Sequence, residues 1–511
     1  MLLADLAATS RALSATRSRL AKRALLVDVL RRTSPREVPV VARYLSGELR
    51  QRRTGLGWRS LTTVPEPAAE PSLHVLDVDA TFERMSQLAG PGSATSRATL
   101  AAELFGAATE AEQILLRGLV TGELRQGALD ALLLDAVAEA AGVPVPLVRR
   151  AAMLAGATEP VAEAALGAGG PEAARAALEG FGLSVGRPVR PMLAGSATDV
   201  GAAFEGFVGR PVVVDAKLDG IRIQVHREGD DVRVFTRSLD DITVRVPEIA
   251  AAVRAMAVRS VVLDGEALAL DADGRPLPFQ ETSARGATHD AEVAATTRLS
   301  PFFFDLLHLD GQDLLDAPLS QRLAALDAVA GEHAVERVTT DDADVAQQAF
   351  ARWVAQGQEG VIVKDLAAPY EAGRRGSAWV KVKPRHTLDL VVLAVERGSG
   401  RRRGLLSNIH LGARDPAGGF VMLGKTFKGM TDEMLAWQTE RFRELEVRDD
   451  GWTVTLRPEQ VVEVAFDGLQ RSTRYPGGLA LRFARVLRYR QDKVADEADT
   501  IDAVRALAAG S

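Results

Sequence analysis

Lysine is scarce in this chain, and one lysine stands where its amine could act as a nucleophile. Only eight of the 62 basic residues are lysine. Along the β-branched run at 212–217, the alternation of side chains places Asp215 and Lys217 on one face, and Asp219-Gly220 then ends the strand. An amine at the end of a hydrophobic strand is partly desolvated, which lowers its pKa and favours nucleophilic attack. Lys217 is therefore the candidate for covalent catalysis, and a solubilising edge-strand lysine is the alternative.

Two more lysines share one face of a second run, at 379–383. Period-two alternation puts Trp379, Lys381 and Lys383 on one side of this segment and two valines on the side that faces the core. Two ammonium groups beside an aromatic ring suit a polyphosphate ligand. A solvent-exposed amphipathic strand has the same pattern.

Carboxylates stand beside glycines at two predicted strand boundaries, in Gly265-Glu266 and in Glu359-Gly360. A carboxylate at such a position can hold a ribose hydroxyl or, directly or through water, a magnesium ion. Exposed acidic turns are the alternative for each of them.

Three consecutive phenylalanines, at 302–304, cannot all point to one side of a strand. Either Phe303 or its two neighbours must be buried, which leaves the other face free to stack on a purine. Packing of all three rings in the core is the alternative.

One apparent nucleotide motif is rejected. Residues 419–426 match the phosphate-binding loop pattern G-x-x-x-x-G-K-[ST]. That loop needs an exposed backbone between its glycines, with a strand before it and a helix after it. Here the intervening residues are themselves an apolar strand, and 427–429 do not open an amphipathic helix.

The elements that must position these residues fall into three parts. A chain of 511 residues is expected to form about three domains of roughly 150 residues each. The composition, 47% hydrophobic and 25% charged, excludes disorder over most of the chain. No apolar run approaches the roughly 20 residues of a membrane span, and Asp5 makes the first residues unlike a signal peptide. The absence of cysteine excludes disulfides, iron–sulfur clusters and cysteine-ligated zinc.

Apolar residues three and four apart predict helices from residue 2 to about 181, for example in 124–141, where five apolar side chains share a face. A Gly/Pro junction at 180–191 separates them from short β-branched runs. We therefore expect a multidomain α+β protein with an all-helical domain at 1–185, a mixed α/β domain at 186–386 and a small barrel of the oligonucleotide-binding (OB) type at 387–511. The predicted strands are 212–217, 221–227, 232–237, 261–268, 301–307, 361–364, 378–383, 388–395, 420–426, 452–456 and 461–466.

Net charge is only −6, but basic residues gather near the amino terminus, where residues 1–60 hold thirteen Lys/Arg against four Asp/Glu. Such a surplus indicates a phosphate-facing surface, with a solvated basic helix as the alternative. Candidate contacts to a nucleic-acid backbone are Arg97, Arg401 and Arg402, for which a flexible surface loop is the alternative.

These motifs together resemble a known family. Lys217-Leu218-Asp219-Gly220 with Arg222 is similar to the K-x-D-G-x-R motif of the covalent nucleotidyltransferases, and in particular of the three-domain ATP-dependent DNA ligases. The family's other motifs follow in order, and 482–493 resembles its last motif. Residues 122–127 resemble the segment of its helical domain that contacts the duplex, which implies a DNA contact for Arg125. The matching middle positions are Arg237, Glu266, Phe304, Glu359 to Lys364, and Lys381 with Lys383.

The resemblance implies a reaction in three steps. Lys217 attacks the α-phosphorus of ATP to give a lysyl–AMP and pyrophosphate, AMP passes to the 5′-phosphate at a nick in duplex DNA, and the 3′-hydroxyl displaces it. All three are displacements at phosphorus, so catalysis consists of alignment and charge neutralisation by Mg²⁺ and cationic side chains. The same carboxylates would accept Mn²⁺.

The resemblance also implies a role for each residue. Phe304 would stack on adenine, Arg222 and Glu266 would position the ribose, and Glu266 with Glu359 would hold the metal. The family has Glu where this chain has Asp215, which is one methylene shorter, so its contact with the adenine amino group is in doubt. The expected phosphate ligands are Lys364, Lys381 and Lys383 on the α-phosphate, Arg237 and Arg375 on the adenylate or nick, and Arg485, Arg490 and Lys493 on pyrophosphate.

Three other functions share part of this sequence pattern. NAD-dependent ligases share the core motif but carry a four-cysteine zinc site, which this chain cannot form. RNA ligases and capping guanylyltransferases share it too, but lack a helical domain before the core. A non-catalytic scaffold that binds nicked DNA would not need the lysines and carboxylates. We expect a monomeric enzyme, without membrane contact, in the cytoplasm of a bacterium in association with the nucleoid.

Overall fold

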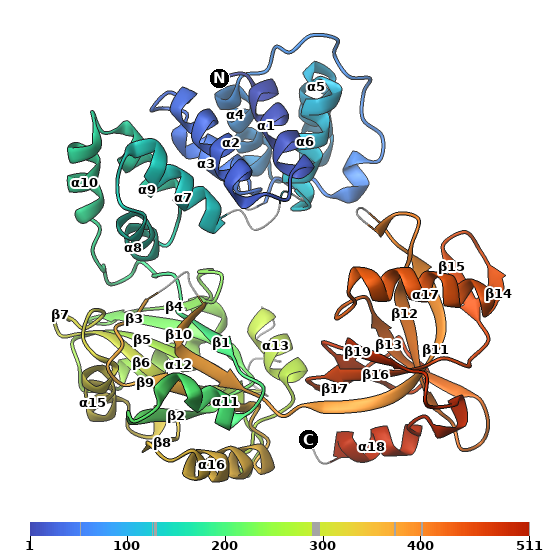
Figure 1. The fold of residues 1–511 in the computed structure, drawn as a ribbon. Helices are drawn as coiled ribbons and strands as arrows, with labels where there is room; N and C mark the ends of the chain where they lie inside the picture. The colour runs from blue at the N-terminus through green and yellow to red at the C-terminus, as the bar shows by residue number, and fades with distance from the viewer. Residues whose placement is uncertain are drawn as a thin grey trace.

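The computed structural model describes the chain apart from residues 52, 125, 127–129, 289–296, 372–374, 400–401 and 510–511, and apart from the side chains of 59, 375, 376 and 509. Figure 1 shows three parts in chain order: a helical part, a central part with two sheets, and a strand-rich part at the carboxyl end. The predicted α+β class, with helices first and a strand-rich region last, is confirmed at this level. No helix in the described ranges is long and apolar enough to cross a membrane.

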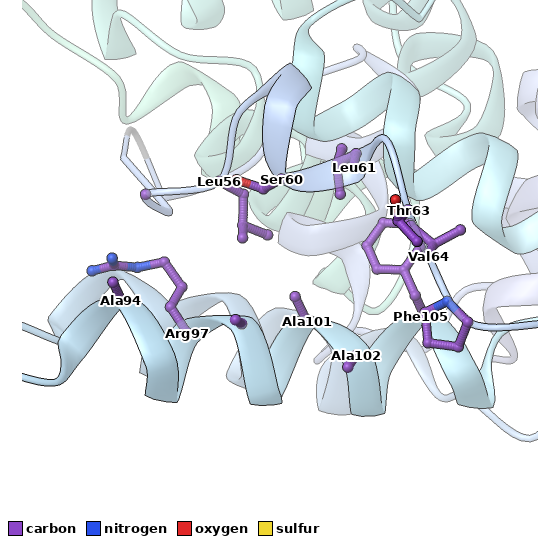
Figure 2. A pocket seen from close by; sticks show the side chains of 13 residues that line it. Leu56, Ser60, Leu61, Thr63, Val64, Ala94, Arg97, Ala101, Ala102 and Phe105 are labelled. Atoms are coloured by element: carbon purple, nitrogen blue, oxygen red, sulfur yellow. The ribbon is translucent and has the colours of Figure 1, made fainter.

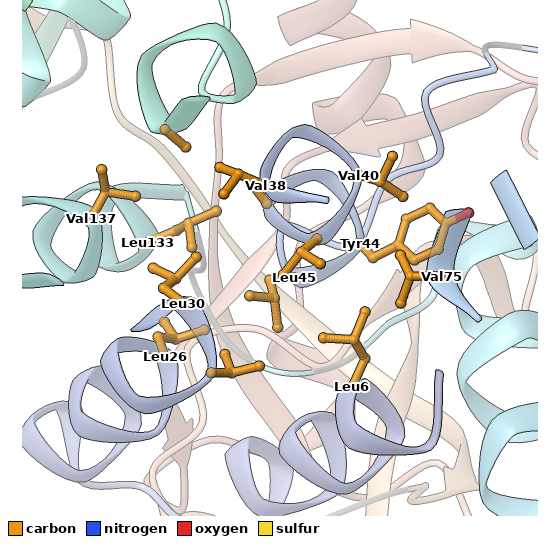
Figure 3. Packing of buried hydrophobic residues seen from close by; sticks show 14 of the residues in the cluster. Leu6, Leu26, Leu30, Val38, Val40, Tyr44, Leu45, Val75, Leu133 and Val137 are labelled. Atoms are coloured by element: carbon orange, nitrogen blue, oxygen red, sulfur yellow. The ribbon is translucent and has the colours of Figure 1, made fainter. Parts of the chain in front are cut away.

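The helical part packs around one continuous core. Side chains from α1, α2, α3 and α7 meet in it, among them Leu6, Leu30, Leu45 and Leu133 (Figure 3). Local signals set several helix ends: Thr109 and Glu112 form a capping box at the start of α6, and Gly122 ends it with φ of 67°. The helices are α1 (Leu3–Ala15), α2 (Arg19–Arg32), α3 (Val38–Leu45), α4 (Val75–Gln87), α5 (Ser93–Ala107), α6 (Glu110–Thr121), α7 (Asp130–Ala141), α8 (Val145–Ala155), α9 (Glu159–Gly167) and α10 (Pro171–Glu179).

The central part contains two five-stranded sheets, in the orders β1-β10-β9-β2-β8 and β4-β3-β5-β6-β7. The valines of β2 are all buried because both faces of that strand are covered. The strands are β1 (Leu193–Ser196), β2 (Val212–Lys217), β3 (Ile221–Glu228), β4 (Asp231–Thr236), β5 (Ser260–Ala269), β6 (Leu299–Leu309), β7 (Gln312–Asp313), β8 (Arg337–Thr340), β9 (Gly360–Asp365) and β10 (Arg375–Val382). The helices are α11 (Val200–Phe204), α12 (Pro247–Arg254), α13 (Phe279–Ala287), α15 (Leu319–Ala330) and α16 (Ala343–Ala355).

The strand-rich part is built on a seven-stranded sheet, β13-β12-β11-β15-β14, in which β16 joins β11 to β19; β17 and β18 pair separately. The strands are β11 (His386–Arg397), β12 (Leu406–Arg414), β13 (Phe420–Thr426), β14 (Glu446–Asp449), β15 (Thr453–Leu456), β16 (Val461–Phe466), β17 (Gly468–Arg471), β18 (Leu479–Arg482) and β19 (Arg485–Arg490), with helices α17 (Asp432–Glu444) and α18 (Ile501–Ala509).

Several strand predictions need correction at their ends. Arg237 lies in the turn after β4, Lys383 follows β10, and Trp452 precedes β15. The residues between the glycines of the rejected phosphate-loop match form β13, and Lys425 in that match binds Glu396. A strand that is paired along its length with β12 cannot wrap its amides around a phosphate, which agrees with the rejection.

Candidate active site

Lys217 and Glu359 are brought together by the pairing of two neighbouring strands. In the antiparallel pair β2 and β9, Lys217 is opposite Gly360, and the Glu359 amide donates to the Lys217 carbonyl at 2.8 Å. The Lys217 Nζ forms an ion pair with Oε2 of Glu359, and the lysine side chain is 19% exposed. The candidate nucleophile is thus half-buried, with a carboxylate in contact with its amine.

Lys383 binds the other oxygen of the same carboxylate. Its Nζ contacts Oε1 of Glu359, and Oδ2 of Asp467 lies 3.3 Å away. Burial alone would lower the pKa of Lys383, but the Glu359 and Asp467 carboxylates hold it above its usual value. Glu359 therefore bridges two lysines, one at the end of β2 and one directly after β10.

Glycine is required at the first position of β9, directly after Glu359. Gly360 has φ of +142°, and a Cβ there would lie 2.1 Å from the Val382 carbonyl oxygen. The close approach of β9 and β10 at this point holds Glu359 near Lys383. Any side chain would push the two strands apart.

Glu266, on β5, completes the acidic side of the cluster. Burial raises its pKa to about 7, against the opposing influence of Lys217 and Arg222, while the negative charge of Glu359 raises it further. Glu266 therefore interacts electrostatically with both Lys217 and Glu359. In the described residues, no group of three or more His, Asp or Glu side chains is arranged to hold a metal, so a cation here would have two carboxylates and further oxygen ligands.

Arg222 lies at the edge of an aromatic wall formed by the rings of Phe304 and Trp379. Its Nε and Nη2 donate to the two oxygens of buried Asp264, at 3.0 and 2.6 Å, and its guanidinium carbon is 5.4 Å from the centre of the Phe304 ring. Phe304 in turn meets Trp379 edge to face at 5.8 Å. Phe303 is fully buried on the opposite side of β6, so the alternation expected for the three phenylalanines is observed.

Asp215 and Lys364 are buried behind this wall. Lys364 is fully buried, with its Nζ 4.7 and 4.4 Å from the ring centres of Phe304 and Trp379, and it forms an ion pair of 2.5 Å with Asp215 that lacks hydrogen-bond geometry. Burial raises the pKa of Asp215, and Lys364 opposes that shift. This arrangement does not support the expected direct contact of Lys364 with a phosphate, nor that of Asp215 with adenine.

The other expected phosphate ligands are dispersed. Lys381 lies half-buried on β10, Arg237 is exposed, and Arg485 lies 3.6 Å from Asp467 at the edge of the cluster. Arg490 and Lys493 instead bind Asp389, at 2.9 and 2.7 Å. Their expected contact with pyrophosphate stays a prediction. The side chain of Arg375 lies outside the described residues.

The candidate nucleic-acid contacts have structural partners where they are described. Arg97 donates to the carbonyls of Met85 and Leu88 at the end of α4, and Arg402 donates to Ser407 and to the Phe427 carbonyl. Arg97 also lines an apolar pocket between α5 and residues 55–65, well apart in the chain from the Lys217 cluster (Figure 2). Arg125 and Arg401 lie outside the described residues.

Four residues of the site were missed by sequence reasoning. Tyr370 and Asp264 support Arg222, and Asp467 reaches Lys383 from the strand-rich part. Arg482 binds Asp219, two residues after Lys217, at 2.6 Å. Arg482 and Asp219 lay within quoted motifs and Asp264 within a predicted strand, whereas Tyr370 and Asp467 carried no signal in spacing or composition.

Known proteins resemble this chain over nearly its full length. Residues 191–383 match the family model described as ATP dependent DNA ligase domain, and 402–493 match the ATP dependent DNA ligase C terminal region. The chain is 73% identical over 510 residues to a "Probable DNA ligase" of Beutenbergia cavernae, covering 99% of this chain and 100% of that protein. It is 58% identical over 514 residues to "DNA ligase B" of Mycobacterium tuberculosis, with coverage of 99% and 100%.

A solved structure described as "Pmar-Lig_PreS3" shares the fold, with a TM-score of 0.63 and 19% identity over 95% of this chain and 99% of that one. This chain belongs to the family of ATP-dependent DNA ligases.

Proposed function

We propose that this DNA ligase seals 5′-phosphate/3′-hydroxyl nicks in duplex DNA with Lys217 as its covalent nucleophile. The observation that carries the proposal is the contact of Lys217 and Lys383 with the two oxygens of Glu359, beside Glu266. This places an amine, a second cation and two carboxylates at one point, which is what a displacement at phosphorus requires.

In the first step, the Lys217 nitrogen bonds to the α-phosphorus of ATP and pyrophosphate leaves. Glu359 contacts the amine and is positioned to accept the proton that the amine gives up. Lys383 would then neutralise charge on the α-phosphate. In the second step AMP passes to the 5′-phosphate of the nick and frees Lys217, and in the third the 3′-hydroxyl displaces AMP.

Glu266 and Glu359 fit a divalent cation. The two half-buried carboxylates repel each other, since Glu359 raises the pKa of Glu266, and a bound cation would relieve that repulsion. Oxygen ligands of this kind suit Mg²⁺ and also Mn²⁺. When bound, the ion neutralises phosphate charge, while the two glutamates hold it next to Lys217.

The aromatic wall is proposed as the nucleoside site. The half-buried Phe304 ring would stack on adenine, and the Arg222 guanidinium would bind the ribose with Glu266. Lys364 would act on the bound nucleotide indirectly, through its contacts with the Phe304 and Trp379 rings and with Asp215. Asp215 would not contact the adenine amino group.

We propose three domains, at 1–185, 186–386 and 387–511, that together enclose the duplex. For the last of them an OB-type barrel is supported by two hydrogen bonds between segments at opposite edges of the sheet: the Thr426 hydroxyl donates to the Ala484 carbonyl and the Val486 amide donates to the Lys428 carbonyl. The basic first 60 residues would contact the DNA backbone. Affinity for nicked DNA should therefore fall with rising salt and show little sequence preference in a titration.

Sealing assays on matched nicked duplexes of DNA and of RNA test the function. We expect ATP-dependent joining of the DNA nick, and none by Lys217→Ala. Preferential joining of RNA would indicate an RNA ligase, and covalent labelling from GTP in place of ATP would indicate a capping enzyme. Binding of nicked DNA without any joining would indicate a scaffold.

A further inference from the structure

Tyr370 is a buried tyrosine behind the proposed nucleoside site and belongs to none of the motifs. It is 1% exposed, and its ring meets the edge of Trp379 at 6.0 Å. Its hydroxyl donates to Oδ2 of Asp264 at 2.7 Å and accepts from the Met192 amide at 3.0 Å. Both hydrogen-bonding capacities of the hydroxyl are therefore used inside the protein.

The partners of Tyr370 are also the partners of Arg222. Oδ2 of Asp264 accepts from Arg222 Nη2 as well as from Tyr370, and the Met192 carbonyl accepts from Arg222 Nη1 at 2.7 Å. A guanidinium has five N–H donors in a rigid plane, and at least three of these are now committed. The plane and direction of the remaining donors are thus set by Asp264 and Met192, and Tyr370 binds both.

Met192 belongs to the junction between the helical part and the sheets. One face of β3 holds this junction at three points: Gly186 donates to His226, Val189 exchanges hydrogen bonds with Gln224, and Met192 accepts from Arg222. The junction is therefore fixed along β3, and Tyr370 secures the end of it that touches Arg222.

We propose that Tyr370 is a positioning residue for ribose recognition: its hydroxyl holds Asp264 and Met192, which orient Arg222 toward the sugar of ATP. The inference rests on the proposed nucleoside site. It predicts that Tyr370 affects how well the enzyme distinguishes ATP from analogues that lack a ribose hydroxyl. It also predicts that Tyr370 does not affect how fast Lys217 reacts once ATP is bound.

The test is the rate of lysyl–AMP formation as a function of nucleotide concentration in Tyr370→Phe, with ATP, 2′-deoxy-ATP and 3′-deoxy-ATP. The substitution keeps the ring and deletes the hydroxyl, which leaves a buried amide unpaired. We expect the ATP concentration for half-maximal rate to rise about five- to tenfold, with the maximal rate changed less than about twofold. The penalty for the deoxy analogue that the wild type discriminates against should shrink toward one.

Tyr44→Phe is the matched control. Tyr44 is equally buried, at 1% exposed, but its hydroxyl has no hydrogen-bond partner among the described residues, so the same chemical change should leave the nucleotide dependence unaltered. Asp264→Asn removes the charge that holds Arg222. It should change the ratio of half-maximal concentrations between the deoxy analogue and ATP in the same direction as Tyr370→Phe does, and by a larger factor.

Two results would overturn the inference. In the first, the wild type discriminates ATP from a deoxy analogue, and Tyr370→Phe has the same half-maximal ATP concentration and the same discrimination as the wild type. The other is a loss in Tyr370→Phe that is confined to the maximal rate. Failure of the proposed function has a different outcome, since the wild type itself would then form no lysyl–AMP.

Discussion

The ionisation state of Glu266 depends strongly on its surroundings in the candidate site. Burial raises its pKa to about 7, whereas a glutamate in an unfolded chain titrates near 4.3. Because the folded value is the higher one, the contribution of Glu266 to stability is fully present below about pH 4.3 and is lost as the pH rises through about 7. At pH 8 the fold must therefore bear the cost of a buried charge, which a cation would reduce.

We expect Glu266→Gln to unfold at a higher temperature than the wild type at pH 8 without divalent metal, because the amide removes that buried charge. The gain should be about 1–3 kcal/mol and should vanish toward pH 4.5, where both side chains are neutral. Thermal unfolding of both proteins across this pH range measures the difference. An equal difference at both pH values would contradict the raised pKa of Glu266.

At the scale of elements, the closeness of β9 and β10 decides whether Glu359 can contact both lysines. Gly360→Ala would place a Cβ against the Val382 carbonyl, in a left-handed conformation that alanine rarely adopts. We expect a loss of several kcal/mol in stability, of order 3, and a large loss of lysyl–AMP formation. Thermal unfolding and an adenylation assay measure the two effects.

Gly357→Ala is the control for this prediction. Gly357 also has a positive φ, of +86°, but a Cβ there would meet nothing within 4 Å. We expect a cost of about 1 kcal/mol and little change in adenylation. Equal effects of the two alanines would show that backbone conformation matters at 360 and that the close approach of the strands does not.

Strands were predictable from sequence where apolar alternation is unbroken. The valine-rich run at 212–217 is β2, as expected. The strand β12 was missed although Ile409, Leu411 and Ala413 alternate with Asn408, His410 and Gly412, which is the period-two pattern of a strand. In the structure Asn408 and His410 bind Glu396 on the neighbouring strand, so their polar groups are satisfied within the sheet.

The contents of the candidate site were predictable only in part. Motif spacing selected Lys217, Glu359 and Lys383, which the structure brings into contact, although their roles stay predictions. The burial of Lys364 could not be foreseen, because it depends on rings from two strands closing over it. The pair Arg482 and Asp219 is separated by 263 residues, and no local pattern reports such a contact.

At the scale of the whole molecule, the outer parts reach the central part through ion pairs of different kinds. Arg482 from the strand-rich part binds Asp219 beside Lys217, with both side chains less than one-third exposed. Arg150 from α8 binds Asp316 in the central part, where both side chains are largely exposed. The first pair lies next to the proposed nucleophile, Lys217, whereas neither member of the second pair belongs to the motifs.

We expect Asp219→Asn and Arg482→Gln each to slow nick sealing about tenfold, and the double variant to be little slower than either, because both break one contact. A double-mutant cycle should give a coupling energy of about 1–2 kcal/mol. The Arg150 and Asp316 pair, changed in the same way, should give less than about 0.5 kcal/mol because it is exposed. Additive losses for Asp219 and Arg482 would contradict a direct role of their contact.

The most direct test of the central claim is the intact mass of the protein after incubation with ATP and Mg²⁺, followed by peptide mapping. The wild type should gain the mass of one AMP, located on Lys217, and transfer it to a nicked DNA when that is added. Lys217→Ala should gain no mass and seal no nick. An adduct on another residue, or joining that persists without Lys217, would contradict the account.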